Sequence, residues 1–411
     1  MPEKSPAEVV HSPGNVSGVR KTLHSIGRVF QRNKTPPAVA TQEPVKAQEV
    51  ATAAGAPESA PVGVKDEWSY NFLQSTLPSY ALKFAPLVYL DQKEEFWPGS
   101  VIKHVLHAHP ETDGGALIDI PEKGMDMLGN PLIRDNVAAY MIIDADPRKK
   151  EPQCIDQFTA KEGKPDASRR SASAAYIITA DKSNEVGEGF VDVFYFYFYP
   201  FNYGGAILGV HMGNHVGDWE HNMIRFRFGV PVYLHMSAHS DGNTYPFNLL
   251  EKIDQRPVVY SARGSHAHYA TIGTQRYSGI PGGPVDYTSK GHLWDPTLNY
   301  VSVNHTSSDG SWSAHKPWPK PQSPACEPLP TDVQTINILS FQGRWGNSFY
   351  EYRHRVQSKD ASLLHRVGST VTDIFDKVMK LVWGEGPTGP RDKSLNRQTV
   401  NRGNNTICDR L

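Results

Sequence analysis

The chain has 411 residues, and its 42 Lys and Arg residues balance 43 Asp and Glu residues to give a formal charge of −1. This balance argues against a nucleic-acid-binding protein, because such proteins concentrate Lys and Arg to neutralise phosphates. No stretch approaches the roughly 18 consecutive apolar residues of a membrane-spanning helix, so we expect none. The 32 prolines are about 8% of the chain against a usual level of roughly 5%, which disfavours long helices.

Residues 1–66 are rich in Pro, Ala, Val, Glu, Lys and Ser, and Phe30 is their single aromatic residue. Such a segment cannot bury enough apolar surface to offset its ordering entropy, so we predict a disordered tail. Residues 19–34 nevertheless combine apolar side chains at helical spacing with basic ones. A helix of this kind could bind an anionic membrane surface or serve as a targeting sequence, or it could form only transiently in the tail. No secretory signal peptide is visible at the start, because no apolar core follows residues 1–6.

Aromatic-rich segments separated by turn residues follow and predict one β-rich domain over residues 67–345. Residues 190–199 contain almost only aromatic and β-branched side chains, which is typical of a strand buried on both faces. Residues 223–228 alternate apolar and basic side chains, which suits a strand with one exposed face. Short strands punctuated by turns predict a mainly β fold, an antiparallel β-sandwich-like domain. Further strands are expected at residues 80–90, 231–236 and 257–262.

Residues 346–411 are predicted to form a helical C-terminal extension. Apolar residues at helical spacing over residues 371–382 predict an amphipathic helix that packs on the sandwich. Just before this extension, residues 341–347 resemble a tight corner in which Trp345 packs in the core.

The three cysteines are too far apart for a zinc ribbon or a disulfide-dense scaffold. Two arrangements fit the sequence: a disulfide between Cys326 and Cys408, or three isolated thiols that include Cys154. The glycine-rich segments do not follow a strand and open a helix, so we expect no nucleotide cofactor.

Nine of the 17 histidines lie between residues 211 and 305, and the densest group is at residues 213–221. If a strand begins at Asp218, alternation puts Asp218 and Glu220 on one face, and His215 can fold back over that face. These three residues could hold a divalent cation, since two carboxylates suit Mg²⁺ or Ca²⁺ and an imidazole admits Mn²⁺ or Zn²⁺. The alternative is a structural network in which the acids bind turn amides.

A second cluster spans residues 261–268, directly after an apolar strand. His266 and His268 share a face if the strand continues, and Arg263 with Gly264 could form a turn that binds a carboxylate or another anion. Ser265 lacks a nucleophile elbow, so nucleophilic catalysis is not favoured. Two loop acids, Asp286 and Asp295, could complete the site. Asp295 precedes a proline and is equally well explained as a turn former.

Six motifs stand in order along the chain: YALKFAPLVYLDQKEEFWP (80–98), FYFYFYPFNYG (194–204), VGDWEHNMIRF (216–226), PVVYSARGSHAHYAT (257–271), HLWDP (292–296) and FQGRWGN (341–347). Together they resemble the fungal vacuolar protein sorting protein sixty-two family, which has relatives in an uncharacterised plant domain family. The resemblance covers residues 78–395 and implies a β-rich protein associated with protein delivery to the vacuole, which is a cellular role and not a chemistry. A vacuolar or endomembrane location follows from the resemblance, whereas the missing signal peptide favours the cytoplasm.

Residues 213–221 are also similar to the H-R-H-D-W-E region of the necrosis- and ethylene-inducing peptide-like toxins, which are metal-binding β-sandwiches that act on membrane lipids. This resemblance implies ligand roles for His215, Asp218 and Glu220. Gly217 stands where the motif has its second His.

Three hypotheses follow. The leading one is a vacuolar sorting protein with a divalent-cation site. The second is a metal-dependent hydrolase in which His266 or His268 transfers protons. The third is a peripheral lipid-binding module that uses residues 19–34.

Overall fold

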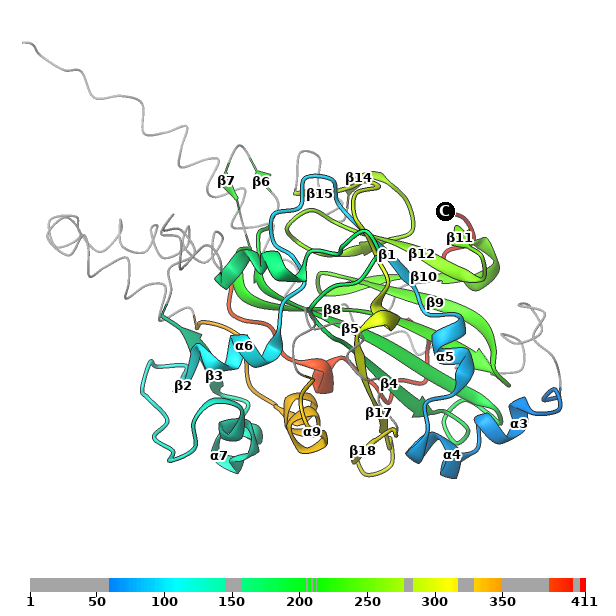
Figure 1. Cartoon of the computed structure of the whole chain (residues 1–411), viewed down its shortest axis with the longest axis horizontal. Helices are drawn as coiled ribbons and strands as arrows, with labels where there is room; N and C mark the ends of the chain where they lie inside the picture. The colour runs from blue at the N-terminus through cyan, green and yellow to red at the C-terminus, as the bar shows by residue number, and fades with distance from the viewer. Residues whose placement is uncertain are drawn as a thin grey trace, which may run out of the picture. The chain divides into compact units, whose positions relative to one another are not determined.

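The computed structural model describes residues 59–144, 157–204, 213–276, 284–316, 329–348, 384–401 and 407–411, together with the backbone of 206–207 and 210–211 (Figure 1). The predicted basic helix at residues 19–34, the predicted amphipathic helix at residues 371–382, and two of the cysteines, Cys154 and Cys326, lie outside the described residues. Cys408 is described and has a free thiol.

A seven-stranded sheet forms the centre of the fold. Neighbouring strands of this sheet pair antiparallel, except for β17 and β4, which pair parallel. The longest strands pair over their whole lengths, from Phe190 opposite Arg227 to Asn202 opposite His215. In spatial order the strands are β10 (Asp241–Pro246), β9 (Val230–Ala238), β8 (His215–Arg227), β5 (Phe190–Asn202), β4 (Ala175–Asp181), β17 (Tyr300–His305) and β18 (Trp312–Ala314).

A second sheet contains five short strands in which β1 runs parallel to β12. Its strands are β11 (Lys252–Ile253), β12 (Arg256–Ser261), β1 (Leu87–Leu90) and β16 (Leu293–Trp294), with β13 (His268–Tyr269) paired to β12. Three two-stranded pairs complete the described strands: β2 (Ala108–Thr112) with β3 (Ala139–Ile143), β6 (Ala206–Ile207) with β7 (Val210–His211), and β14 (Gly273–Arg276) with β15 (Val285–Thr288).

The helices are short. The α-helices are α3 (Val64–Glu67), α4 (Tyr70–Ser75), α5 (Ser79–Lys83), α6 (Val101–Leu106), α7 (Pro131–Arg134) and α9 (Asp332–Ser340). The 3₁₀ turns are η2 (Gly124–Gly129), η3 (Lys161–Gly163), η4 (Phe247–Leu249), η5 (Pro296–Leu298) and η6 (Pro390–Asp392).

Side-chain alternation along β5 creates two cores. Its tyrosines, among them Tyr197 and Tyr199, pack with the second sheet and with α4 and α5, and we call this side of the seven-stranded sheet the tyrosine face. Its phenylalanines, among them Phe196, pack on the opposite side with α6, α7, α9 and Trp345, and we call that side the phenylalanine face. Figure 1 shows α6, α7 and α9 grouped on the other side of the view from α4 and α5. Every residue of β5 is buried, as predicted for a strand covered on both faces.

The predicted mainly β, sandwich-like fold is confirmed, but both large sheets are mixed because each contains one parallel pair. The prediction of a strand over residues 80–90 is wrong for its first part, where α5 forms and the strand starts only at Leu87. The helical turn aims the carbonyl of Ala81 at the buried hydroxyl of Tyr195, which donates to it at 2.6 Å.

The expected exposed face of residues 223–228 is also corrected. Arg225 is only 3% exposed because its guanidinium forms two hydrogen bonds of 2.7 Å to the carboxylate of Asp192. The predicted domain boundaries at residues 66 and 345 stay predictions. Described residues beyond the second boundary nevertheless pack into the body, since Leu395 belongs to the core of the phenylalanine face. Trp345 is fully buried there, as predicted for the corner at residues 341–347.

Candidate functional site

Strand β8 places the two predicted acids on the tyrosine face. Trp219 packs in the core of the phenylalanine face, so Asp218 and Glu220 point to the opposite side, as alternation predicts. The strand is anchored at Gly217, which has φ of +69° and lies so close to the backbone of Trp345 that a Cβ would be 1.8 Å from its carbonyl oxygen. Only glycine satisfies both conditions.

His266 is the centre of the network on this face. The residue lies between β12 and β13 in a left-handed conformation, with φ of +57°. Its ring stacks on Tyr199 with centroids 3.7 Å apart and planes 5° from parallel. Nδ1 donates to Asp218 Oδ2 at 2.9 Å and Nε2 donates to the carbonyl of Phe96 at 3.0 Å.

The hydrogen bonds of His266 define its charge. A carboxylate and a carbonyl can only accept, so both ring nitrogens carry protons and the imidazole is cationic. Burial lowers the pKa of His266, but the hydrogen bond to Asp218 and the charge of Glu94 outweigh burial and leave the pKa raised. A buried cation therefore lies between two buried carboxylates.

Glu94 supplies the second carboxylate, and its Oε1 lies 3.9 Å from His266 Nε2. It accepts from the amides of Glu95, Phe96 and Gly264, each at 2.9 Å. Burial raises its pKa, opposed by His266 and these amides. The sequence analysis did not identify Glu94.

The turn at Arg263 and Gly264 does bind carboxylates, as the sequence suggested, but they belong to the chain itself. The Gly264 amide binds Glu94, and Arg263 Nη2 donates to Glu95 Oε1 at 3.1 Å. The turn therefore joins the second sheet to the segment that follows β1. This pairing leaves the turn occupied by internal anions.

Glu220 lies beside Asp218 and is buried. Burial and the charge of Asp218 raise the pKa of Glu220 well above its ordinary value. The hydroxyl of Ser237 on β9 donates to Glu220 Oε2 and accepts from the amide of His221 at 2.8 Å.

Asp286 joins the network and Asp295 does not. Asp286 accepts from Ser265 Oγ, Tyr269 Oη and His239 Nε2, each at 2.7 Å, and its charge also raises the pKa of Glu220. Asp295 instead pairs with both terminal nitrogens of Arg256, at 2.6 and 2.7 Å, and caps η5. Of the two explanations for Asp295, the turn former agrees with these contacts.

The remaining two predicted histidines are neutral. Burial lowers the pKa of His268 to about 3, and its ring meets that of Tyr197 edge to face with centroids 5.4 Å apart. Burial also lowers the pKa of His215, opposed by Asp218, and its Nδ1 donates to the carbonyl of Gly217 at 2.6 Å. Both rings are therefore uncharged, which is the form that can bind a metal or pack in a core. Neither carries the extra proton that a general acid would transfer.

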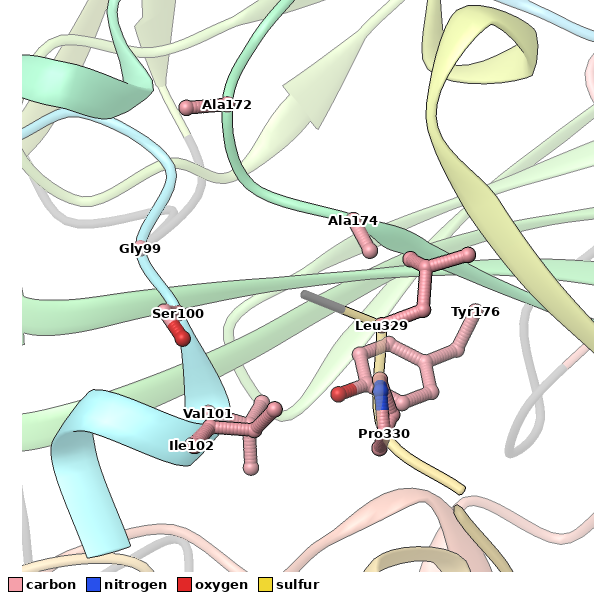
Figure 2. Close-up of a pocket in the computed structure, with 9 residues that line it drawn as sticks. All are labelled: Gly99, Ser100, Val101, Ile102, Ala172, Ala174, Tyr176, Leu329 and Pro330. Carbon is pink, nitrogen blue, oxygen red and sulfur yellow. The ribbon is translucent and has the colours of Figure 1, made fainter. Parts of the chain in front are cut away.

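Within the ranges that the structure describes, no group of three His, Cys, Asp or Glu side chains is arranged to hold a metal ion. The small cavity in Figure 2 is elsewhere, between the start of α6 and β4, and is lined by Ser100, Val101, Tyr176 and Leu329 among others. Its volume of about 10 Å³ matches roughly one water molecule. The described helices include none that is long and apolar enough to cross a membrane.

Comparison with known proteins finds related sequences over most of the chain. A sequence model of the family described as Vacuolar protein sorting-associated protein 62 matches residues 161–281. The TDA6 protein of Saccharomyces cerevisiae is 32% identical over 338 residues, which cover 74% of this chain and 68% of that protein. The chain belongs to the vacuolar protein sorting-associated protein 62 family. Vacuolar protein sorting-associated protein 62 of the same yeast is 32% identical over 302 residues, 67% of this chain and 60% of that protein. The family resemblance inferred from the ordered motifs is confirmed.

Solved structures show a weaker likeness. Necrosis and Ethylene inducing Protein 2 from the causal agent of cocoa's witches' broom disease is 15% identical with a TM-score of 0.23, covering 52% of this chain and 76% of that one. NLPPya in complex with glucosamine is 12% identical with a TM-score of 0.24, covering 60% and 76%. The non-toxic HaNLP3 protein is 13% identical with a TM-score of 0.25, covering 60% and 79%.

Proposed function

We propose that this protein takes part in protein delivery to the vacuole and is located on the endomembrane route. The observation that supports the role is the 32% identity to a yeast relative over 338 residues, a match long enough to include most of the chain. This role is a cellular process and not a chemical reaction. The part of the structure that suggests a chemical function is the buried network on the tyrosine face.

A yeast strain that lacks both relatives tests the role. If the proposal holds, this strain secretes vacuolar hydrolases, expression of the present chain restores their delivery, and a fluorescent fusion of the chain lies on the vacuole or endomembranes. Normal hydrolase delivery in the strain without the relatives would contradict the sorting role. So would a chain that is expressed at the relatives' level and restores nothing.

The second part of the proposal is that the network binds a divalent cation through His215, Asp218 and Glu220, with Asp286 as an added source of negative charge. The donors suit Mg²⁺, Ca²⁺ or Mn²⁺ because two of them are carboxylates. His215 has the arrangement that metal-binding histidines share, since its Nδ1–H is fixed by a backbone carbonyl and its other nitrogen is left as a ligand. A cation bound here would favour the ionised form of Glu220, whose pKa burial and the charge of Asp218 raise.

Titration calorimetry of the full chain with Mg²⁺, Ca²⁺ and Mn²⁺ tests the site. Because the pKa of Glu220 is raised and a bound cation favours the ionised carboxylate, we expect proton release on binding, seen as a heat that depends on the buffer. The Glu220→Gln variant replaces the carboxylate by an amide of similar shape and should fold, yet should bind about tenfold more weakly or not at all. Glu251→Gln, at a half-exposed carboxylate, is the matched control. Equal cation binding by both variants would exclude the ligand set.

A metal-dependent hydrolase is less well supported by the geometry. His268 is a neutral core residue, and His266 donates from both nitrogens to groups of the protein itself. Arg263, the third candidate, is paired with Glu95. None of these three candidates presents a reactive atom to a described cavity, so the network resembles a binding or structural site more than a catalytic one.

A further inference from the structure

A second cluster of buried charges lies on the phenylalanine face, at the end of the seven-stranded sheet where β4 and β17 finish. Lys182 follows β4 and is fully buried. Ser307 and His305 come from the end of β17 and the turn after it. Arg225 of β8 adds a further buried cation. This cluster has no part in the network on the tyrosine face.

Among the described residues, Lys182 has no ion-pair partner in this cluster. Asp192 is the buried carboxylate of the group, and both of its oxygens are bound by Arg225 at 2.7 Å. Lys182 forms no ion pair with any residue that the structure describes, and its one hydrogen bond there, to Ser307 Oγ, is 3.4 Å long. A buried ammonium held by one long hydrogen bond is unfavourable, so a further acceptor at this position would stabilise its charge.

His305 points to the same need. Its side chain is 8% exposed, and its Nδ1 has no hydrogen-bond partner among the described residues. Burial lowers the pKa of His305 to about 4, and the charges of Lys182 and Arg391 lower it further. An anion bound here would favour a proton on this nitrogen and would offset the two cations.

The acids around the cluster leave Lys182 without an ion pair. Glu185 and Asp192 oppose the lowering of the Lys182 pKa that burial causes. Asp309, the acid of the turn, accepts from the amide of Ser311 at 2.8 Å. The turn is closed by hydrogen bonds at both ends and is exposed from residue 308 to 310, so the buried donors lie directly below the surface.

We propose that Lys182, His305 and Ser307 form a binding site for a phosphate-type oxyanion. The donors are an ammonium, an imidazole N–H and a hydroxyl, which together suit a single tetrahedral phosphate group. The group is either a free anion or the headgroup of a phosphorylated lipid, because the chemistry of recognition is the same for both.

Calorimetry with the full chain tests the site, with inorganic phosphate as one probe. The other probe is a phosphatidylcholine vesicle that contains phosphatidylinositol phosphate, compared with phosphatidylcholine alone. We expect the wild-type chain to bind one probe, and Lys182→Met and Ser307→Ala to weaken this binding by about tenfold or more. Lys103→Met removes the same charge at an exposed position and should bind as the wild type does.

The outcomes separate the sources and decide the proposal. Phosphate binding identifies a free anion, and binding only to the phosphorylated vesicles identifies a lipid headgroup. A wild-type chain that binds neither probe would overturn the site, and so would equal losses in Lys182→Met and Lys103→Met. If Lys182→Met does not fold, Ser307→Ala decides alone, because its side chain lies on the surface turn; unchanged binding by that folded variant rejects the assignment.

Discussion

The pH dependence of stability is set by histidines that the fold holds neutral, and His268 gives the sharpest test. Its pKa is about 3 in the folded protein, because burial disfavours the charged ring, against an ordinary value of 6.5. Unfolding therefore exposes a group that takes up a proton below pH 6.5. The stability from this group is fully present above pH 6.5 and is lost as the pH falls toward 3, and between pH 7 and pH 5 the loss is about 2 kcal/mol.

Other buried histidines also lower the stability of the fold as the pH falls, whereas the groups of the network on the tyrosine face have the opposite effect. His104, with a pKa of about 3, and His305, with a pKa of about 4, destabilise the fold further in acid. The raised pKa values of His266, Glu94 and Glu220 act in the other direction, since these groups bind protons more tightly when folded. Comparing the wild type with a single variant isolates one group from this sum.

Urea unfolding of His268→Leu and of the wild type, followed by tryptophan fluorescence at pH 7 and pH 5, measures the effect. Leucine fills a similar volume without a titrating group, so the variant should lose about 2 kcal/mol less than the wild type between the two pH values. The exposed His107 gives the matched control, His107→Leu, which should keep the wild-type dependence. An unchanged pH dependence in His268→Leu would refute the assignment of a neutral, buried ring.

Three further predictions concern packing, charge and the tail. Gly217→Ala should lower the free energy of unfolding by more than about 1 kcal/mol, because a left-handed backbone and the carbonyl of Trp345 both exclude a Cβ; wild-type stability in urea would contradict this. Arg225→Met should cost about 3–5 kcal/mol by leaving Asp192 unpaired, and adding Asp192→Leu should recover most of it in the same assay. Deleting residues 1–66 should abolish flotation with anionic liposomes if the predicted basic helix binds membranes; undiminished flotation removes that helix from the account.

The parts of the fold that the sequence predicts are those set by neighbouring residues. Alternation of tyrosine and phenylalanine in β5, and of acid and apolar residues in β8, follows from the pleat of a strand and needs no tertiary information. The capping box at Thr331 and Gln334 that starts α9 was an equally local signal, and it could have predicted this helix. The helix over residues 79–83 has no side-chain cap, and its carbonyl at Ala81 accepts from the hydroxyl of Tyr195 in a strand far along the chain.

The candidate site could not be predicted in the same way, because the residues that contact one another there are far apart in the sequence. Strand alternation could place Asp218 and Glu220 together, but nothing local connects Asp218 with His266, 48 residues later. Glu94 is 170 residues from Gly264, and the two meet only because β1 and β12 pair in parallel and bring their following loops to one edge. The charge of each group depends on these long-range partners. Histidine density therefore indicated the region in which His266 and Asp218 meet, whereas the direction in which each pKa shifts follows only from the fold.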